Sequence, residues 1–193
     1  MDFGKIIRRI RNLIITPAQE WEAIRGEKLS MAAMLTQYLL VMAAVPALAN
    51  FIGYTVVGLP VAPGLQIRVD PVGGLTAAVF RYGLSLAAVY VTAFLIHKLA
   101  PVFDAERDWM AAFKLSAFTY LPIWAVSVIL VVPLFGRLLV LLSIYSVYIF
   151  YVGLPKMMRH NADKTIPFMV VPMLTVLILS WLIYAVSAEL RGI

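Results

Sequence analysis

The sequence predicts an all-α membrane protein, built as a transmembrane bundle of five helices that follows an amphipathic interfacial helix. Five long apolar stretches fill most of the 193 residues. Each is close to the roughly 20 apolar residues that a helix needs to cross a bilayer. The chain is also 63% hydrophobic, well above the roughly 45–50% of soluble domains, so too little polar chain remains to cover the stretches. The stretches cover residues 31–59, 75–100, 110–134, 138–155 and 166–188.

The chain divides into a cytoplasmic N-terminal segment, residues 1–28, and a five-span membrane domain, residues 29–193. Apolar residues recur at helical spacing in the first fifteen residues, which predicts an amphipathic helix lying flat in the headgroup layer. Its other side is basic, and each basic residue near an anionic surface contributes about 1 kcal/mol of attraction. The residues expected to bind anionic headgroups are Lys5, Arg8, Arg9 and Arg11.

A second short helix is expected to follow. Thr16 is placed to cap it, Pro17 suits the first helical position, and Gln19 completes a capping box. Gly26 is typical of a helix end. Trp21 lies on the apolar face of this helix, and we expect it to rest at the membrane interface, where tryptophan is favoured.

The basic residues predict an orientation. With the N-terminus in the cytoplasm, 12 of the 16 Lys and Arg residues fall on the inner side of the five spans. Cytoplasmic loops of membrane proteins carry such an excess. The C-terminus is then outside. The net charge of +6 therefore reflects membrane orientation, and we expect no nucleic-acid partner.

No catalytic, metal or cofactor site is expected. No Asp or Glu falls in the hydrophobic core of any stretch, although ion-coupled carriers usually place a carboxylate there. His97 and His160 are the only histidines, and neither has a neighbour at ligand spacing. Cysteine is absent, and no zinc-protease or serine-nucleophile motif occurs. The chain is therefore predicted not to be an enzyme.

Two cations lie within apolar stretches, Arg81 about six residues into the second and Lys114 about five residues into the third. At about 1.5 Å per residue their depths are roughly 7–9 Å. Long basic side chains reach the headgroups from such depths by snorkelling, and this is the favoured interpretation. Alternatively, Arg81 faces the interior of the bundle, where it pairs with Asp70 or binds an anion or a lipid headgroup.

Tyrosines and prolines are the remaining candidate functional residues. Tyr145, Tyr148 and Tyr151 recur every three residues, which favours packing and interfacial anchoring, with a partner-binding or substrate-lining face as the alternative. Pro46 and Pro122 fall inside predicted spans. Prolines at such positions break transporter helices around a midplane cavity.

Several segments resemble the Yip family, the Ypt-interacting or Rab-interacting integral membrane proteins. The sequence ITPAQEW at 15–21 is similar to the family's entry segment, and MAAVPA at 42–47 with FIG at 51–53 resembles the first span of its small bacterial inner-membrane members. AFTYLP at 117–122 resembles the third span, and YSVYIFYVGLP at 145–155 the tyrosine-rich segment. The resemblance implies five spans, a cytosolic N-terminus and the bacterial cytoplasmic membrane.

Two hypotheses for function follow. The first is a non-enzymatic membrane protein that organises or binds lipids, other membrane proteins or further copies of itself. The second is a channel or transporter for a small solute, an anion or a lipid. The second predicts a hydrated cavity that reaches Arg81 or the tyrosines of the fourth span.

Overall fold

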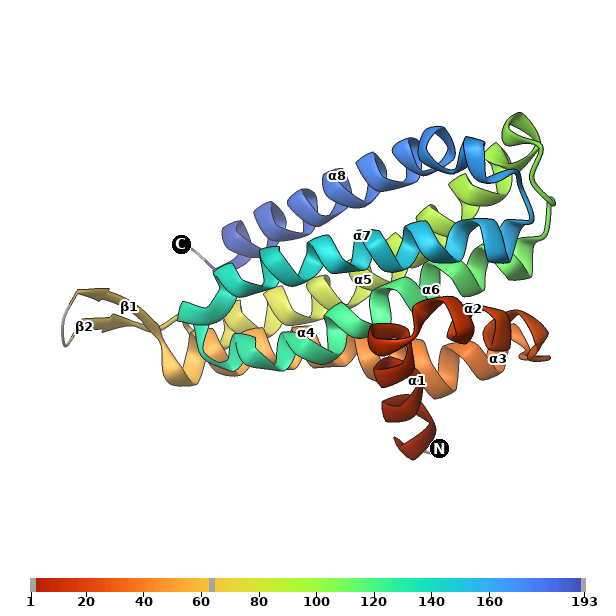
Figure 1. The fold of residues 1–193 in the computed structure, drawn as a ribbon. Coiled ribbons are helices and arrows are strands. Elements are labelled where there is room, and N and C mark those ends of the chain that lie inside the picture. Colours follow the sequence, from red (N-terminus) through yellow and green to blue (C-terminus); the bar gives the residue numbers. More distant parts are fainter. Residues whose placement is uncertain (1–2, 63–64, 192–193) are drawn as a thin grey trace.

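The protein is almost entirely helical in the computed structural model, which describes residues 3–62 and 65–191 (Figure 1). Two short helices open the chain, a two-stranded hairpin follows the first long helix, and one-turn 3-10 helices join the later ones. The main elements are α1 (Phe3–Ile15), α2 (Pro17–Gly26), α3 (Met31–Met34), α4 (Leu40–Ile52), β1 (Leu59–Ala62), β2 (Leu65–Ile67), α5 (Pro71–Leu99), α6 (Trp109–Val126), α7 (Gly136–Met158) and α8 (Thr165–Arg191). Two one-turn π-helices flank α4: η1 (Leu35–Leu39) and η2 (Gly53–Val57). The 3-10 helices are η3 (Ala100–Phe103), η4 (Ser127–Val131), η5 (Pro133–Phe135) and η6 (Ala162–Lys164).

Four helical segments of the described chain are long and apolar enough to cross a membrane. They agree with four of the five predicted stretches to within a few residues. α7 occupies the position of the remaining stretch and runs beside α6 (Figure 1). The all-α bundle is thus confirmed, whereas the count of five spans stays a prediction. The segments are Met31–Val57, Pro71–Phe103, Trp109–Val131 and Ala162–Leu190.

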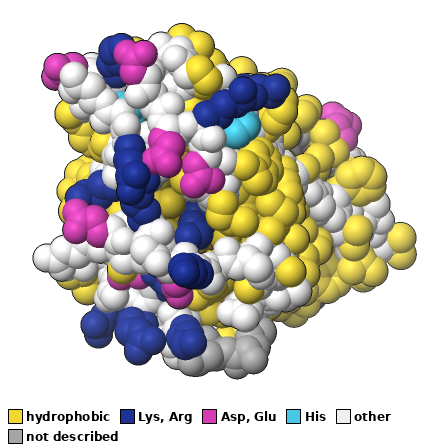
Figure 2. Space-filling model, turned by 90° about the vertical axis from the view of Figure 1, so that its right-hand side faces the viewer, with side chains coloured by type: hydrophobic (Ala, Val, Ile, Leu, Met, Phe, Trp, Pro, Cys, Tyr) yellow, Lys and Arg dark blue, Asp and Glu magenta, His cyan; other side chains and the backbone are white. Residues whose placement is uncertain are grey.

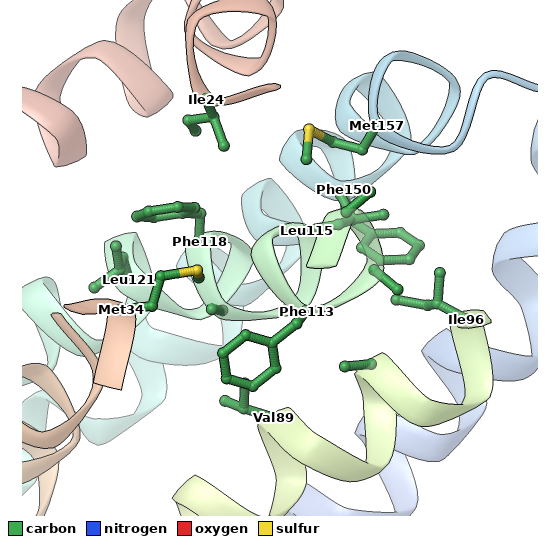
Figure 3. Packing of buried hydrophobic residues seen from close by; sticks show 14 of the residues in the cluster. Ile24, Met34, Val89, Ile96, Phe113, Leu115, Phe118, Leu121, Phe150 and Met157 are labelled. Carbon is green, nitrogen blue, oxygen red and sulfur yellow. The ribbon is translucent and has the colours of Figure 1, made fainter. Parts of the chain in front are cut away.

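Helix α6 forms the centre of the bundle. Its side chains from Ala111 to Thr119 are all buried, and it contacts α1, α4, α5 and α7. Figure 3 shows Phe113, Leu115 and Phe118 of α6 among side chains from neighbouring elements, including Ile24 of α2. α8 lies at the periphery, mainly against α5, and most of its side chains remain accessible for contact with lipid.

Charged residues gather at one end of the bundle, which we call the charged end (Figure 2). It consists of α2, the α5–α6 connection at 100–108 and the α7–α8 connection at 159–164. Ion pairs join these three segments: Arg25 and Arg159 bind Glu106 at 2.9 and 3.5 Å, and Lys164 binds Asp104. The segments that the sequence predicts to share the cytoplasmic side therefore lie together.

The opposite end of the bundle carries the β-hairpin and the end of α8 (Figure 1). β1 and β2 pair antiparallel, with Leu59 opposite Ile67. Gly58 begins the hairpin at φ +91°, in the left-handed region that favours glycine.

The two prolines that the sequence predicts to break spans lie inside continuous helices. Pro46 falls within α4 and Pro122 within α6. Close to Pro46, the Asn50 side chain donates a hydrogen bond to the Pro46 carbonyl oxygen at 2.7 Å. The expectation that these prolines break their helices is therefore wrong.

The predicted capping box of α2 does not form. The Thr16 side chain makes no cap hydrogen bond to α2 and instead donates to the Asn12 carbonyl oxygen of α1 at 3.3 Å. α1 ends one residue before Thr16, so the hydroxyl finds an acceptor in the preceding helix. Pro17 at the start and Gly26 at the end of α2 are as predicted.

Candidate functional site

Helix α2 is anchored in the bundle by Trp21. The Trp21 side chain is fully buried, and its Nε1 donates a hydrogen bond to the Ile149 carbonyl oxygen of α7 at 3.0 Å. Gly153, one turn further along α7, leaves the room that the indole ring fills, because a Cβ there would stand 2.4 Å from the ring. This placement corrects the expectation that Trp21 rests at the membrane interface.

Arg9 points into the protein rather than toward lipid. Its side chain is 11% exposed and pairs with Glu20 at 2.6 Å and with Glu27, while its guanidinium lies 5.2 Å from the centre of the Phe118 ring. Burial opposes the charge, but the carboxylates of Glu27 and Glu20 outweigh it and raise the pKa of the Arg9 guanidinium. Asn12 completes the cluster by donating to Glu20 at 2.9 Å. The prediction that Arg9 binds lipid headgroups is corrected accordingly.

Lys114 also faces the interior. It is buried, and its Nζ donates hydrogen bonds to the carbonyl oxygens of Ile24, at 3.1 Å, and Glu27, at 2.5 Å. These carbonyls lie at the C-terminal end of α2, where the helix dipole favours a positive charge. The favoured prediction of snorkelling is wrong for Lys114, because its side chain is buried and its ammonium group bonds to carbonyl oxygens inside the protein.

The other basic residues that are predicted to bind lipid lie on the outer surface of α1. Lys5, Arg8 and Arg11 are exposed. Ile6 and Leu13 are buried, whereas Phe3, Ile7 and Ile14 on the adjoining stripe are exposed. The apolar face of α1 is therefore wider than the protein covers. A groove of about 290 Å³ runs between α1 and α2. It is lined by Lys5, Arg8, Arg9, Asn12, Glu20, Ala23, Glu27 and Tyr38.

The tyrosines of α7 lie on an exposed side of that helix. The rings of Tyr145 and Tyr148 are in contact, with centroids 5.5 Å apart. The Tyr145 hydroxyl donates a hydrogen bond to the Ile14 carbonyl oxygen at 2.5 Å, which fixes the end of α1 to α7. The cavity-facing residues of α7 are other ones: Ser143, Ile144, Ser146, Val147 and Phe150.

Arg81 is half-buried and lines a cavity of about 160 Å³ between α4, α5, α6 and α8, which Pro46 also lines. A pair with Asp70 is excluded, since eleven residues of α5 separate the two by about 16 Å. Asp70 instead caps α5 and accepts hydrogen bonds from the amides of Val72 and Gly73 at 3.0 and 3.1 Å.

A second cavity, which sequence reasoning missed, lies between α7 and α8. We call it the lateral cleft. Its volume is about 400 Å³, within the range of roughly 300–1,000 Å³ typical of ligand sites. One sequence feature could have indicated this cleft: serine and threonine residues recur at spacings of three, at 116 and 119 and at 143 and 146. The lining residues are Thr92, Ser116, Thr119, Tyr120, Ile123, Ser143, Ile144, Ser146, Val147, Phe150, Met173, Val176, Leu177 and Ser180.

Both histidines pack against aromatic rings at the charged end. His160 is buried, its Nε2 lies 3.0 Å from the Thr165 hydroxyl, and burial lowers the pKa of its imidazole. His97 meets the Trp109 ring edge-on. Across residues 3–62 and 65–191, no group of three or more His, Asp or Glu side chains could hold a metal ion.

Comparison with known protein families assigns this chain to one of them. Residues 11–184 match the Yip1 domain. The chain is 25% identical over 155 residues to the inner membrane protein YohC of Escherichia coli K12, and equally to the protein of that name in E. coli O6:H1. The match covers 79% of this chain and 80% of each relative. No solved structure matches the chain at a significant level.

Proposed function

Because this chain belongs to the Yip1 domain family and is a multi-pass protein of the bacterial inner membrane, we propose that it is a non-enzymatic module that binds and organises membrane lipid. In this proposal five helices span the membrane and the charged end faces the cytoplasm. α1 then lies on the cytoplasmic leaflet and binds its anionic headgroups.

The placement of α1 carries this proposal. α1 runs across the axis of the bundle, between its middle and the charged end (Figure 1). It presents an exposed apolar stripe of Phe3, Ile7 and Ile14 beside the exposed basic residues Arg8 and Arg11. A helix with this surface, lying across the direction of the spans, inserts its apolar stripe at the boundary between headgroups and acyl chains, and its basic residues attract anionic lipid.

The interior cations support a binding role over a catalytic one. Arg9 is engaged by two carboxylates, and Lys114 by the end of α2. Both side chains thus hold α1 and α2 on the membrane domain, which keeps the α1 surface in a fixed place. A fixed surface loses little conformational freedom on binding, which favours affinity.

The proposed topology rests on α7 and on the charges. α7 has 23 residues, enough for a span of about 34 Å, and it joins the hairpin end to the charged end. If α7 did not cross, the two connections that it joins would face the same side of the membrane. The charged end also collects most of the basic loop residues, as cytoplasmic loops do.

The topology predicts opposite labelling of two engineered cysteines. The protein contains no cysteine, so Gln66→Cys in β2 and Asp163→Cys in η6 are each the only thiol. We expect a membrane-impermeant maleimide to label Gln66→Cys on intact spheroplasts and Asp163→Cys only after permeabilisation. Labelling of both on intact cells, or of Asp163→Cys alone, would refute the orientation.

The lipid-binding role predicts that α1 senses anionic lipid. Ile7→Cys is labelled with an environment-sensitive fluorophore, and the protein is placed in nanodiscs of phosphatidylcholine with or without phosphatidylglycerol. We expect phosphatidylglycerol to shift the emission to the blue. Replacing both Arg8 and Arg11 with glutamine removes about 2 kcal/mol of attraction and should abolish most of this shift.

A label at Lys28→Cys provides the control, because Lys28 is exposed just beyond α2 and away from the apolar stripe of α1. Its emission should not respond to phosphatidylglycerol. High salt should also weaken the response at Ile7, since the Debye length falls to about 3 Å at 1 M. An Ile7 signal that is the same in both lipid mixtures would overturn the proposed role of α1.

A further inference from the structure

The lateral cleft opens to the side of the bundle, between α7 and α8. Ser143, Ile144 and Val147 on α7 are exposed along its mouth, and so are Leu177 and Ser180 on α8. Figure 1 shows the two helices diverging over this region. Because both helices lie at the periphery, the mouth faces the acyl chains of the surrounding bilayer.

The hydroxyl groups on the inner wall of the cleft are already used by the protein. Thr92 donates to the Ala88 carbonyl oxygen at 2.8 Å, Ser116 to that of Val89 at 2.9 Å and Thr119 to that of Leu115 at 2.7 Å. With their hydrogen atoms turned to the backbone, these side chains present mainly methyl and methylene surface. The wall therefore suits an apolar occupant, although its composition is partly polar.

Tyr120 differs from these residues. Its hydroxyl oxygen is buried and has no hydrogen-bond partner of good geometry among the described residues, although Thr92 is near. A buried hydroxyl without a partner costs roughly 1–3 kcal/mol. The Tyr120 hydroxyl is therefore available to donate a hydrogen bond to an acceptor that enters the cleft beside the ring.

The cleft continues toward Arg81. Tyr120, Ile123 and Ser180 line both the lateral cleft and the cavity that holds Arg81. Counted by helical rise from the charged end, Arg81 lies about 10 Å nearer to the hairpin end than Tyr120. From the middle of the bundle outward, the two cavities thus present an apolar wall, then a hydroxyl donor, then a cation.

We propose that the lateral cleft binds one acyl chain of a glycerophospholipid from the leaflet on the hairpin side. The order of groups in such a lipid, a hydrocarbon chain, an ester carbonyl and an anionic phosphate, matches the order of groups in the two cavities. The chain occupies the cleft, the ester carbonyl accepts from the Tyr120 hydroxyl, and the phosphate lies toward Arg81. This site is separate from α1 and binds the opposite leaflet.

Photocrosslinking tests this assignment. The full-length protein is placed in phosphatidylcholine nanodiscs that contain a small fraction of phosphatidylglycerol with a diazirine on one acyl chain, and the labelled peptides are mapped by mass spectrometry. We expect saturable labelling of the cleft walls, at Ser146 on α7 and Met173 on α8. Excess unlabelled phosphatidylglycerol should compete, whereas oleate should not.

Two variants and a matched control make the test decisive. Ser180→Phe fills the junction of the two cavities and should lower labelling of the cleft at least tenfold. Ile178→Phe adds a ring of the same size on the same helix, but Ile178 is 64% exposed and lies outside the cleft lining, so labelling should not change. Arg81→Gln should weaken competition by phosphatidylglycerol about tenfold, through loss of a charge-assisted hydrogen bond.

Equal labelling in Ser180→Phe and Ile178→Phe would mean that only lipids surrounding the bundle react, and it would overturn the proposal. Competition by oleate as strong as that by phosphatidylglycerol would overturn the choice of a phospholipid. Unchanged competition by phosphatidylglycerol in Arg81→Gln would refute the role of Arg81. This test does not depend on whether Ser180→Phe folds. None of these outcomes depends on whether α1 binds anionic lipid.

Discussion

Replacing Arg9 with methionine is expected to release α1 from the membrane domain. The Arg9 guanidinium links α1 to α2 through Glu20 and Glu27 and to α6 through Phe118. Methionine keeps the length of the side chain but leaves Glu20, at 10% side-chain exposure, as a largely buried carboxylate without its cation. Breaking a buried ion pair on one side costs about 3–5 kcal/mol.

Hydrogen exchange of the α1 amides measures this effect directly. A loss of about 3 kcal/mol lowers protection by roughly 100-fold or more, because each 1.4 kcal/mol corresponds to a factor of ten. Exchange in the centre of α6 should change little, since Leu115 and its neighbours are packed from all sides. The change is therefore expected in α1 and α2 alone, as a local opening.

Arg8→Met is the matched control, because Arg8 is the adjacent residue on the same helix and is exposed. Its replacement should leave α1 protection within about a factor of two, in line with surface substitutions of about 0.5 kcal/mol or less. Adding Glu20→Gln and Glu27→Gln to Arg9→Met should restore part of the protection, since the uncompensated charges are then gone. Equal loss in Arg8→Met and Arg9→Met would contradict a special role for Arg9.

The sequence alone was sufficient for the long helices. A stretch such as 75–100 differs so strongly from soluble chain in hydropathy that α5 (Pro71–Leu99) is predicted to within a few residues. The reason is that the bilayer fixes the length of a span and excludes unpaired backbone groups. These constraints act on each segment separately and need no knowledge of its neighbours.

The placement of Arg9, Trp21 and Lys114 could not be predicted in the same way. Arginine, lysine and tryptophan usually lie at the headgroups or the interface of a membrane protein, and the predictions rested on this preference. The predictions were wrong where the residue has a specific partner inside the protein. For Lys114 that partner is the end of α2, some 90 residues away in sequence. Partners so far apart in the sequence depend on how the helices pack against one another. The pattern of residues within one segment does not predict that packing.

The lateral cleft and Arg81 show the same limit at a candidate site. The sequence identified Arg81 as a cation within an apolar stretch and favoured snorkelling for it. Asp70 was an alternative partner, which helical rise excludes. The residues that accompany Arg81 come from four helices. The role of Gly153 could not be predicted from the sequence either. The sequence does not reveal whether a glycine makes room for a neighbouring side chain or simply faces lipid.

Replacing Gly153 with leucine should undock α2 from the bundle. A Cβ at this position would stand 2.4 and 2.6 Å from atoms of the Trp21 ring and 2.9 Å from a methyl group of Leu115. The ring cannot retreat, because it is fully buried and its Nε1 is bonded to the Ile149 carbonyl oxygen. Expelling Trp21 from its site should cost about 3–5 kcal/mol, similar to truncating a buried tryptophan to alanine.

The measurements are hydrogen exchange in α2 and thermal stability in detergent. Gly153→Leu should expose the α2 amides and lower the unfolding temperature, and Gly153→Ala should do so to a smaller degree, since overpacking by a single methyl group costs about 1–3 kcal/mol. Undocking of α2 also removes the two carbonyl acceptors of Lys114, so Gly153→Leu and Lys114→Met should be strongly non-additive. Additive effects would show that α2 stays in place.

The same substitutions at Gly83 separate this steric effect from helix propensity. Gly83 lies inside α5, and among the described residues no atom is found within 4 Å of where its Cβ would stand. Gly83→Ala and Gly83→Leu should therefore leave stability unchanged or raise it by up to about 1 kcal/mol, the usual helix preference over glycine. If Gly153→Leu were as harmless as Gly83→Leu, the packing of Trp21 against α7 would not be what holds α2 on the bundle. That result would contradict the proposed anchoring of α2 by Trp21.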